Sequence, residues 1–159
     1  MSELPRSAQR VADAAASHGL TLEIVEYPDG TRTADDAAQA VGCAVGQIVK
    51  SLIFGFGDGL VLALTSGSNR VDASRLAELA GGGECTRADA DAVRTVTGYA
   101  IGGVPPFGHD NAVPAFFDPD LLDHDVVWAA AGTPRHVFPI DPRRLLELTG
   151  ATVGAFTET

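Results

Sequence analysis

The chain has 159 residues and a formal net charge of -10. This length suits one domain over residues 1–159, and no run approaches the roughly 18 apolar residues that cross a bilayer. The acidic balance argues against a protein that coats duplex DNA, because such binding depends on many phosphate contacts. We therefore expect a cytoplasmic single-domain protein with neither a membrane nor a duplex DNA partner.

The first half of the chain predicts short helices that alternate with strands. Gly19 suits the end of an amphipathic helix over 7–18, and Thr33 suits the N-cap of a second helix that ends before Gly42. Alternating or apolar runs predict strands over 21–27, 47–54 and 59–65, and the glycines between the last two indicate a hairpin.

The second half predicts two helices, then strands, then a final helix. Asp72 and Thr86 are the expected N-caps of helices that end near Gly81 and Gly98. Strands are expected over 113–117, 126–131 and 135–140, and Asp141 followed by proline predicts the start of the last helix. Strands that follow one another directly favour an α+β domain with a mixed, largely antiparallel sheet.

Lys50 is the single lysine beside ten arginines, and it stands in an apolar strand. Period-2 alternation places it on the face of Ile48, Leu52 and Phe54, so its ammonium must find an acceptor or a ligand. We consider Lys50 a candidate site residue. The structural alternatives are a lysine that protects an edge strand and a lysine that extends its head to solvent.

The segment Gly102-Gly103-Val104-Pro105-Pro106-Phe107-Gly108 reads as a shaped loop. Glycine lets the backbone approach a ligand and present N–H groups to a carbonyl oxygen, although a tight turn between strands fits the spacing equally well. The sequence contains no GxSxG motif and no histidine or cysteine pair at metal-ligand spacing. We therefore expect no metal and no cofactor.

A local contact with the end of a nucleic acid remains compatible with the charge. It requires that a few cations converge, and the candidates are Lys50, Arg32, Arg70 and Arg135.

The order of three motifs gives the chain its resemblance to a known family. Lys50 in its strand, the Gly102-Gly103 loop and the Gly132-Thr133-Pro134-Arg135 turn resemble the YbaK/ProX family of aminoacyl-tRNA deacylases, from about Ala8 to Gly150. The same module resembles the editing insertion of bacterial prolyl-tRNA synthetases. The resemblance implies a compact, barrel-like α+β domain with flanking helices.

The family likeness also implies an activity and a site. The protein would hydrolyse, in trans, the ester of a mischarged aminoacyl-tRNA, such as tRNA(Pro) carrying Ala or Cys. Water would attack with help from the substrate's ribose hydroxyl, Lys50 would lie in the site, and backbone N–H groups of Gly102 and Gly103 would stabilise the oxyanion. The implied substrate-binding residues are Tyr27, Pro105, Phe107, Gly132, Thr133, Pro134 and His136.

The implied partners are the 3′ end of aminoacyl-tRNA and, to assist its binding, prolyl-tRNA synthetase or an elongation factor. Two other functions fit the same residues. One is a module that binds aminoacyl-adenosine or a nucleotide without turning it over. The other is a regulatory partner of a synthetase, for which Lys50 would be incidental.

Overall fold

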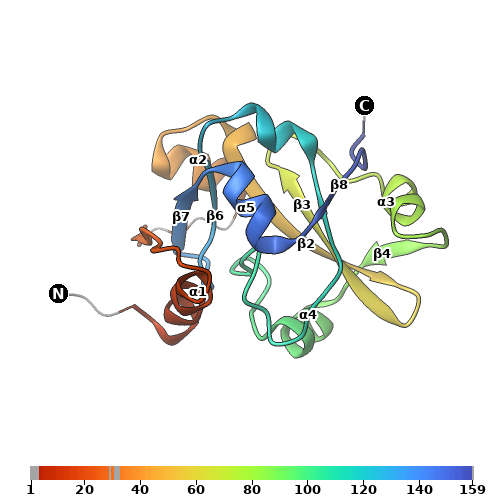
Figure 1. Cartoon of the computed structure of the whole chain (residues 1–159), viewed down its shortest axis with the longest axis horizontal. Coiled ribbons are helices and arrows are strands. Elements are labelled where there is room, and N and C mark those ends of the chain that lie inside the picture. Colours follow the sequence, from red (N-terminus) through yellow and green to blue (C-terminus); the bar gives the residue numbers. More distant parts are fainter. Residues whose placement is uncertain (1–3, 29, 31–32, 159) are drawn as a thin grey trace.

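The structure is a computed structural model that describes residues 4–28, 30 and 33–158. Its regular elements alternate short helices with short strands along the chain (Figure 1). In chain order they are α1 (Arg6–Ala16), β1 (Val25–Glu26), α2 (Ala34–Val41), η1 (Val45–Gln47), β2 (Ile48–Phe56), β3 (Gly59–Ser66), α3 (Ala73–Leu79), β4 (Cys85–Arg87), α4 (Ala90–Thr97), β5 (Ala115–Phe117), η2 (Pro119–Asp123), β6 (Val127–Ala130), β7 (His136–Ile140), α5 (Pro142–Thr149) and β8 (Thr152–Val153).

The strands form one open sheet in the order β1-β7-β6-β2-β3-β5-β8, and β4 pairs with β2 beside this path. β2 is antiparallel to β3 and β4, and β7 is antiparallel to β1 and β6. β2 and β6, β3 and β5, and β5 and β8 are parallel pairs. The mixed, largely antiparallel sheet and the α+β class are as predicted.

Alternation along β2 and β3 separates two of the three core clusters, and the third joins Ile48 to α2. Val49 and Ile53 face a large cluster that includes Val11 of α1 and Leu145 of α5. Phe54, on the other face of β2, belongs to a second cluster built with α3. The central hairpin is therefore covered on both faces by helices, which explains its nearly continuous apolar sequence.

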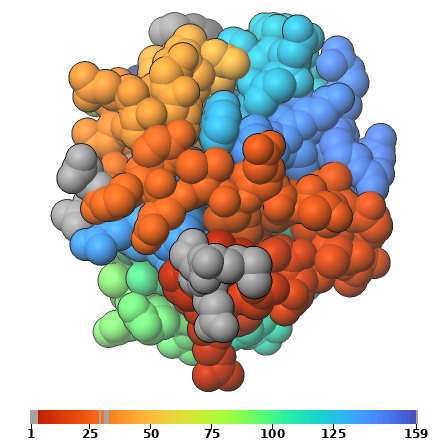
Figure 2. Space-filling model, turned by 90° about the vertical axis from the view of Figure 1, so that its left-hand side faces the viewer, coloured from red at the N-terminus to blue at the C-terminus, as the bar shows by residue number. Residues whose placement is uncertain are grey.

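The N-terminal third of the chain covers one side of the molecule. In Figure 2 the red-to-orange segments spread over this side beside the blue C-terminal segments. Contacts of α1 explain this position: an added Cβ on Gly132 would lie 2.5 Å from the Ser7 carbonyl oxygen, and one on Gly108 would lie 3.0 Å from Ala14 Cβ. α1 therefore packs closely against two separate loops.

Most of the predicted helix boundaries are confirmed by their caps. The Thr33 side chain accepts a hydrogen bond from Asp36 N at 3.0 Å, and Asp72 and Asp141 cap α3 and α5. Gly42, Gly98 and Gly150 end their helices in the left-handed conformation. Local side-chain chemistry was enough to place these ends.

Two local predictions were wrong. Thr86 is not a helix cap: it pairs with Gly55 in β4, and Asp89 caps α4 by accepting from Ala92 N at 2.8 Å. The strand predicted over 21–27 is reduced to Val25–Glu26, where β7 supplies its partner. In both cases strand pairing with a distant segment decided the outcome, and the local pattern did not reveal it.

Candidate functional site

The site lies where one edge of β2 loses its partner. β3 pairs with β2 along its whole length, whereas the opposite edge pairs with β6 only at Ile48 and Val49, and with β4 only from Phe54 to Phe56. Between these ends, the Ile53 carbonyl accepts from Ala88 N at 3.1 Å. Within the described ranges, no strand pairs with the opposite edge at Lys50, Ser51 or Leu52, so this edge faces a pocket.

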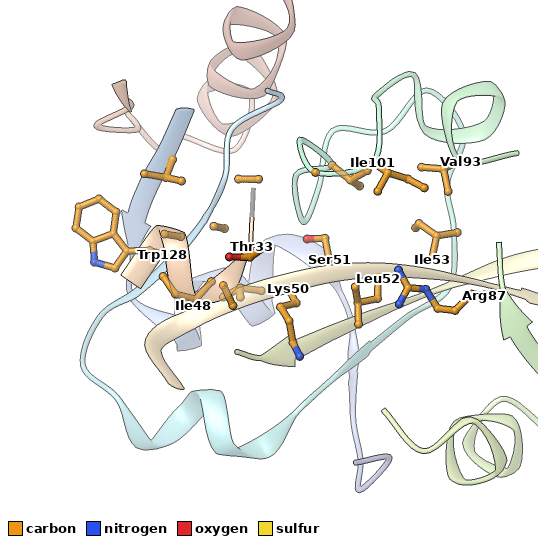
Figure 3. A pocket seen from close by; sticks show the side chains of 18 of the residues that line it. Thr33, Ile48, Lys50, Ser51, Leu52, Ile53, Arg87, Val93, Ile101 and Trp128 are labelled. Atoms are coloured by element: carbon orange, nitrogen blue, oxygen red, sulfur yellow. The ribbon is translucent and has the colours of Figure 1, made fainter. Parts of the chain in front are cut away.

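The pocket has a volume of about 410 Å³ and is formed by segments that are distant in the sequence (Figure 3). They are the start of α2, the open part of β2, the end of β4, the loop after α4, and strands β6 and β7. The lining residues are Thr33, Ala34, Ala37, Ile48, Val49, Lys50, Ser51, Leu52, Ile53, Arg87, Ala88, Val93, Ile101, Gly102, Val104, Trp128, Ala129, Ala130 and Val137.

One side of this pocket is an apolar chamber. In Figure 3, Ile53, Val93 and Ile101 gather on the same side of β2 as Ser51. Val93 is buried, whereas Ile101 is 50% exposed at the mouth. A chamber lined in this way suits a small apolar group that enters from solvent.

Ser51 brings an unpaired hydroxyl into the pocket. Its Oγ is buried and has no hydrogen-bond partner among the described residues, and its side chain points to the chamber side of β2. A buried polar atom without a partner costs about 1–3 kcal/mol, which a ligand that hydrogen-bonds to it would recover. Sequence reasoning missed this residue, although a polar side chain on the core face of an apolar strand was a usable signal.

Lys50 also lines the pocket, but its side chain leaves β2 on the other side (Figure 3). The predicted alternation is therefore correct. Its ammonium donates to the Asn69 carbonyl oxygen. Burial, and then the charges of Arg70 and Arg87, lower the pKa of Lys50. β2 lies between β6 and β3 in the sheet order, so it is not an edge strand. Lys50 borders the pocket because neither β6 nor β4 pairs with β2 at that residue.

The two predicted loop glycines differ in position. Gly102 lines the pocket with φ +95°, and its N–H has no acceptor in the described part of the chain. Gly103 N–H instead donates to the Ala100 carbonyl at 3.0 Å, and a Cβ on Gly103 would lie 2.7 Å from Thr133 Cα. Gly103 thus allows the loop to pack against the 132–136 turn, while Gly102 faces the pocket.

The other predicted contacts do not line the pocket. Thr133 Oγ1 and His136 Nδ1 are hydrogen-bonded at 2.6 Å, and His136 Nε2 lies 3.7 Å from Glu26 Oε2. Tyr27 N donates to the Arg135 carbonyl at 2.7 Å. Gly132 and Pro134 belong to this same turn, and its Thr133 backbone packs against Gly103 of the glycine loop.

Pro105 and Phe107 are likewise buried supports. The Phe107 ring packs 5.8 Å from the Phe138 ring, centroid to centroid, within the large core cluster. His109 Nε2 donates to the Pro105 carbonyl at 2.7 Å, and burial lowers the pKa of His109. Neither Pro105 nor Phe107 lines the pocket. These residues hold the loop that presents Gly102.

The described residues contain no group of three or more His, Cys, Asp or Glu side chains that could hold a metal ion. None of their helices combines the length and hydropathy that a transmembrane span requires. The arrangement offers a backbone N–H, a hydroxyl and a single ammonium around a small apolar chamber.

Comparison with known proteins decides the family. The model of the aminoacyl-tRNA editing domain matches residues 28–156. The chain belongs to the aminoacyl-tRNA editing domain family. This confirms the predicted YbaK-type relationship and supports the general class of aminoacyl-tRNA deacylase. The matched range contains every pocket residue and begins after α1.

Individual relatives agree with this assignment. A crystal structure described as a candidate trans-editing enzyme for prolyl-tRNA synthetase is 50% identical, with a TM-score of 0.93 over 99% of this chain and 100% of that one. EbsC of Enterococcus faecalis, named as a candidate Cys-tRNA(Pro)/Cys-tRNA(Cys) deacylase, is 26% identical over 79% of this chain and 76% of its own. The proline–tRNA ligase of Thermosipho africanus is 33% identical over 57% of this chain and 16% of its own.

Proposed function

We propose that this protein is a trans-editing hydrolase that removes a small wrong amino acid, such as alanine or cysteine, from tRNA(Pro). The observation that carries the proposal is the pocket at the open edge of β2, in which an apolar chamber adjoins Ser51, Lys50 and Gly102. Membership of the editing-domain family and the relatives described as prolyl-tRNA editing proteins support it.

The proposed reaction uses water as the nucleophile. Its oxygen bonds to the ester carbonyl carbon, assisted by the free ribose hydroxyl of the terminal adenosine. The bond between that carbon and the esterified ribose oxygen then breaks, and the ribose oxygen takes a proton. The products are the free amino acid and tRNA with both terminal hydroxyls restored.

The chain's own groups would orient the ester and stabilise the developing oxyanion. Gly102 N–H suits this role because Gly102 lines the pocket and its N–H has no acceptor among the described residues. Gly103 N–H, in contrast, already donates to the Ala100 carbonyl oxygen. In comparable acyl transfers, loss of one oxyanion donor costs about 3–4 kcal/mol. Lys50 would hold the terminal nucleotide or the developing charge, and the chamber would receive the amino-acid side chain.

The apolar lining of the pocket would discriminate between amino acids by their size. The lining near the open edge consists of small or medium apolar side chains, including Val93, Ala129 and Val137. An added methylene in such a chamber changes binding by about 1–3 kcal/mol. Small side chains such as those of alanine and cysteine are therefore the proposed substrates. Help from prolyl-tRNA synthetase is part of the same proposal, whereas the elongation factor remains a prediction without support from the comparisons.

The test is hydrolysis of tRNA(Pro) charged with alanine, cysteine, serine or proline by wild type and Lys50→Ala. We expect wild type to release one small wrong amino acid selectively. Lys50→Ala should remain folded, and its hydrolysis rate should be about 100-fold or more below that of wild type. Arg143→Ala, which removes an exposed charge on α5, is the matched control and should keep the wild-type rate.

Failure to release any of these amino acids by folded wild type would reject the proposal and favour the non-catalytic binding module. Equal rates for wild type and Lys50→Ala would reject the proposed role of Lys50.

A further inference from the structure

The face of β2 opposite the apolar chamber carries positive charge. Lys50 and Leu52 project to this face in Figure 3, and Arg87 lies beside them. Arg87 pairs with Phe54 in the β2–β4 register, and its guanidinium carbon lies 5.6 Å from the centre of the Phe54 ring. The Arg87 side chain is exposed and held over a strand. Its charge is thus fixed near the open edge.

Arg70 belongs to the loop after β3 that contacts Lys50. It follows Asn69, whose carbonyl oxygen accepts a hydrogen bond from the Lys50 ammonium. The charges of Arg70 and Arg87 both contribute to the lowered pKa of Lys50, after the larger effect of burial, so both guanidinium groups act on one ammonium. We call Lys50, Arg70 and Arg87 the cationic face.

Carboxylates lie near this group without forming an ion pair with it in the described part of the chain: the charges of Asp118 and Asp35 act on the Lys50 ammonium in the opposite sense to the two arginines. Asp118 is fully buried and accepts from Ser66 N at 3.0 Å and from Asn69 Nδ2 at 2.8 Å, while Asp120 accepts from the same amide at 2.8 Å. Within the described ranges, the ion pairs of basic side chains with carboxylates involve Arg10, Arg75, His136 and Arg144, and none involves the cationic face.

Three like charges that form no ion pair among the described residues are unusual in a chain with 21 acidic residues against 11 basic ones. Like charges held near one another repel, and an anion between them would relieve that cost. Guanidinium groups match phosphate geometry especially well. The ligand class that this face fits is therefore a phosphate-bearing one.

We propose that the cationic face binds phosphates of the single-stranded 3′ end of tRNA, so that the substrate crosses the open edge of β2. The inference rests on the proposed function. The terminal phosphates would lie on the side of Arg70 and Arg87, and the esterified amino acid would lie in the chamber beside Ser51. The arrangement explains how a chain with a net charge of -10 could hold RNA through a short local contact.

Binding of a labelled, uncharged single-stranded ACCA oligoribonucleotide over a series of salt concentrations tests the proposal. The test variant is Arg70→Gln/Arg87→Gln, and the control is Arg6→Gln/Arg143→Gln, which removes two exposed charges from α1 and α5. Both pairs change the net charge equally. Because this RNA carries no ester, the readout does not depend on deacylation.

We expect the test variant to bind about tenfold more weakly at low salt. The slope of log affinity against log salt should fall by about 1.4 if two phosphate contacts are lost, since each contributes about 0.7 for a single strand. Arg70→Lys/Arg87→Lys, which keeps both charges, should retain most of the slope. The control should match wild type.

Equal weakening by the test and control variants would overturn the proposal, because net charge alone would then explain binding. Equal affinity of wild type for AMP and for the oligonucleotide would also overturn it in favour of a mononucleotide site. Failure of wild type to hydrolyse charged tRNA would instead count against the proposed function, whatever this binding assay shows.

Discussion

At the residue scale, Ser51 and Lys50 show how adjacent positions on one strand serve opposite sides of the site. Ser51 places a buried, unpaired hydroxyl on the chamber side, whereas Lys50 places an ammonium on the cationic face. Lys50 and Gly102 could be predicted because their residue types were unusual for their context. Ser51 was missed although its polar side chain on the core face of an apolar strand was a usable signal. Arg87 could not be assigned to a site from sequence, because its position depends on the gap between β6 and β4 along β2.

Substitution of Ser51 should separate stability from activity. Ser51→Ala removes a buried polar atom that lacks a partner, so we expect the free energy of unfolding to stay constant or rise by up to about 1 kcal/mol. Deacylation should fall, because the hydroxyl would no longer contact the substrate. Denaturant unfolding and single-turnover hydrolysis measure the two effects.

Ser66→Ala is the matched control for this substitution. Ser66 Oγ is also within the sheet, but it donates to the Gly46 carbonyl at 2.8 Å. Its loss should lower the free energy of unfolding by about 1 kcal/mol. Activity should be kept. If Ser51→Ala instead loses stability and keeps activity as Ser66→Ala does, the hydroxyl is structural.

The lowered pKa of Lys50 predicts an alkaline limit to activity. Burial, and then the charges of Arg70 and Arg87, outweigh the opposite effect of Asp118 and Asp35, so the pKa of Lys50 lies below the 10.5 expected for a free lysine. If the charged form is required, the rate is full below the lowered pKa and falls as pH rises through it. Arg87→Gln should raise this pKa and move the limit to higher pH.

The measurement is the pH dependence of hydrolysis after subtraction of the spontaneous reaction. Movement of the limit to lower pH in Arg87→Gln, or no alkaline limit in wild type, would contradict the electrostatic account of Lys50.

At the element scale, α1 supports both the glycine loop, which lines the pocket, and the 132–136 turn, which packs against that loop. Arg10 pairs with Asp110, and its guanidinium carbon lies 4.7 Å from the centre of the Tyr99 ring. Tyr99 OH in turn donates to the Gly108 carbonyl at 3.2 Å. Since Gly132 packs on the α1 backbone as well, this helix sets the spacing between the glycine loop and the 132–136 turn.

Exchange of the two charges tests this positioning role. Arg10→Asp and Asp110→Arg should each loosen the loop, while the double variant should restore the pair. The ion pair is partly exposed, with 35% and 50% of the two side chains accessible, so a stability loss of only about 1 kcal/mol is expected. We expect a larger effect on function, about tenfold in kcat, with faster amide exchange across 99–109.

Recovery of both kcat and slow exchange in the double variant would support positioning. A fall in activity that merely follows the fraction unfolded, with unchanged exchange in the loop, would contradict it.

Elements with strong local signals were predictable. Caps at Thr33, Asp72 and Asp141 predicted where α2, α3 and α5 begin, Gly42, Gly98 and Gly150 predicted where α2, α4 and α5 end, and the glycines between β2 and β3 predicted their turn. β4 and β8 were not predicted, because strands of three and two residues form through distant partners.

At the scale of the whole molecule, sheet connectivity creates the site. The class was predictable from the order of strands and helices, but the parallel pairing of β2 with β6 was not, since nothing local specifies it. That pairing stops after two residues of β2, and the pairing of β2 with β4 begins only at Phe54. The residues between them form the open edge. Thr133 and His136 do not line the pocket, because this edge and not the turn faces it, and their contact with substrate stays a prediction.

The measurement that tests the central claim most directly is a crystal structure with a nonhydrolysable 3′-alanylamide analogue of a CCA oligonucleotide. We predict that the alanyl methyl group lies in the chamber near Ile53 and Val93, and that the amide oxygen accepts from Gly102 N–H. The phosphates should lie across β2 beside Arg70 and Arg87. An analogue bound elsewhere, for example in the 280 Å³ pocket beside His18 and His109, would contradict the account.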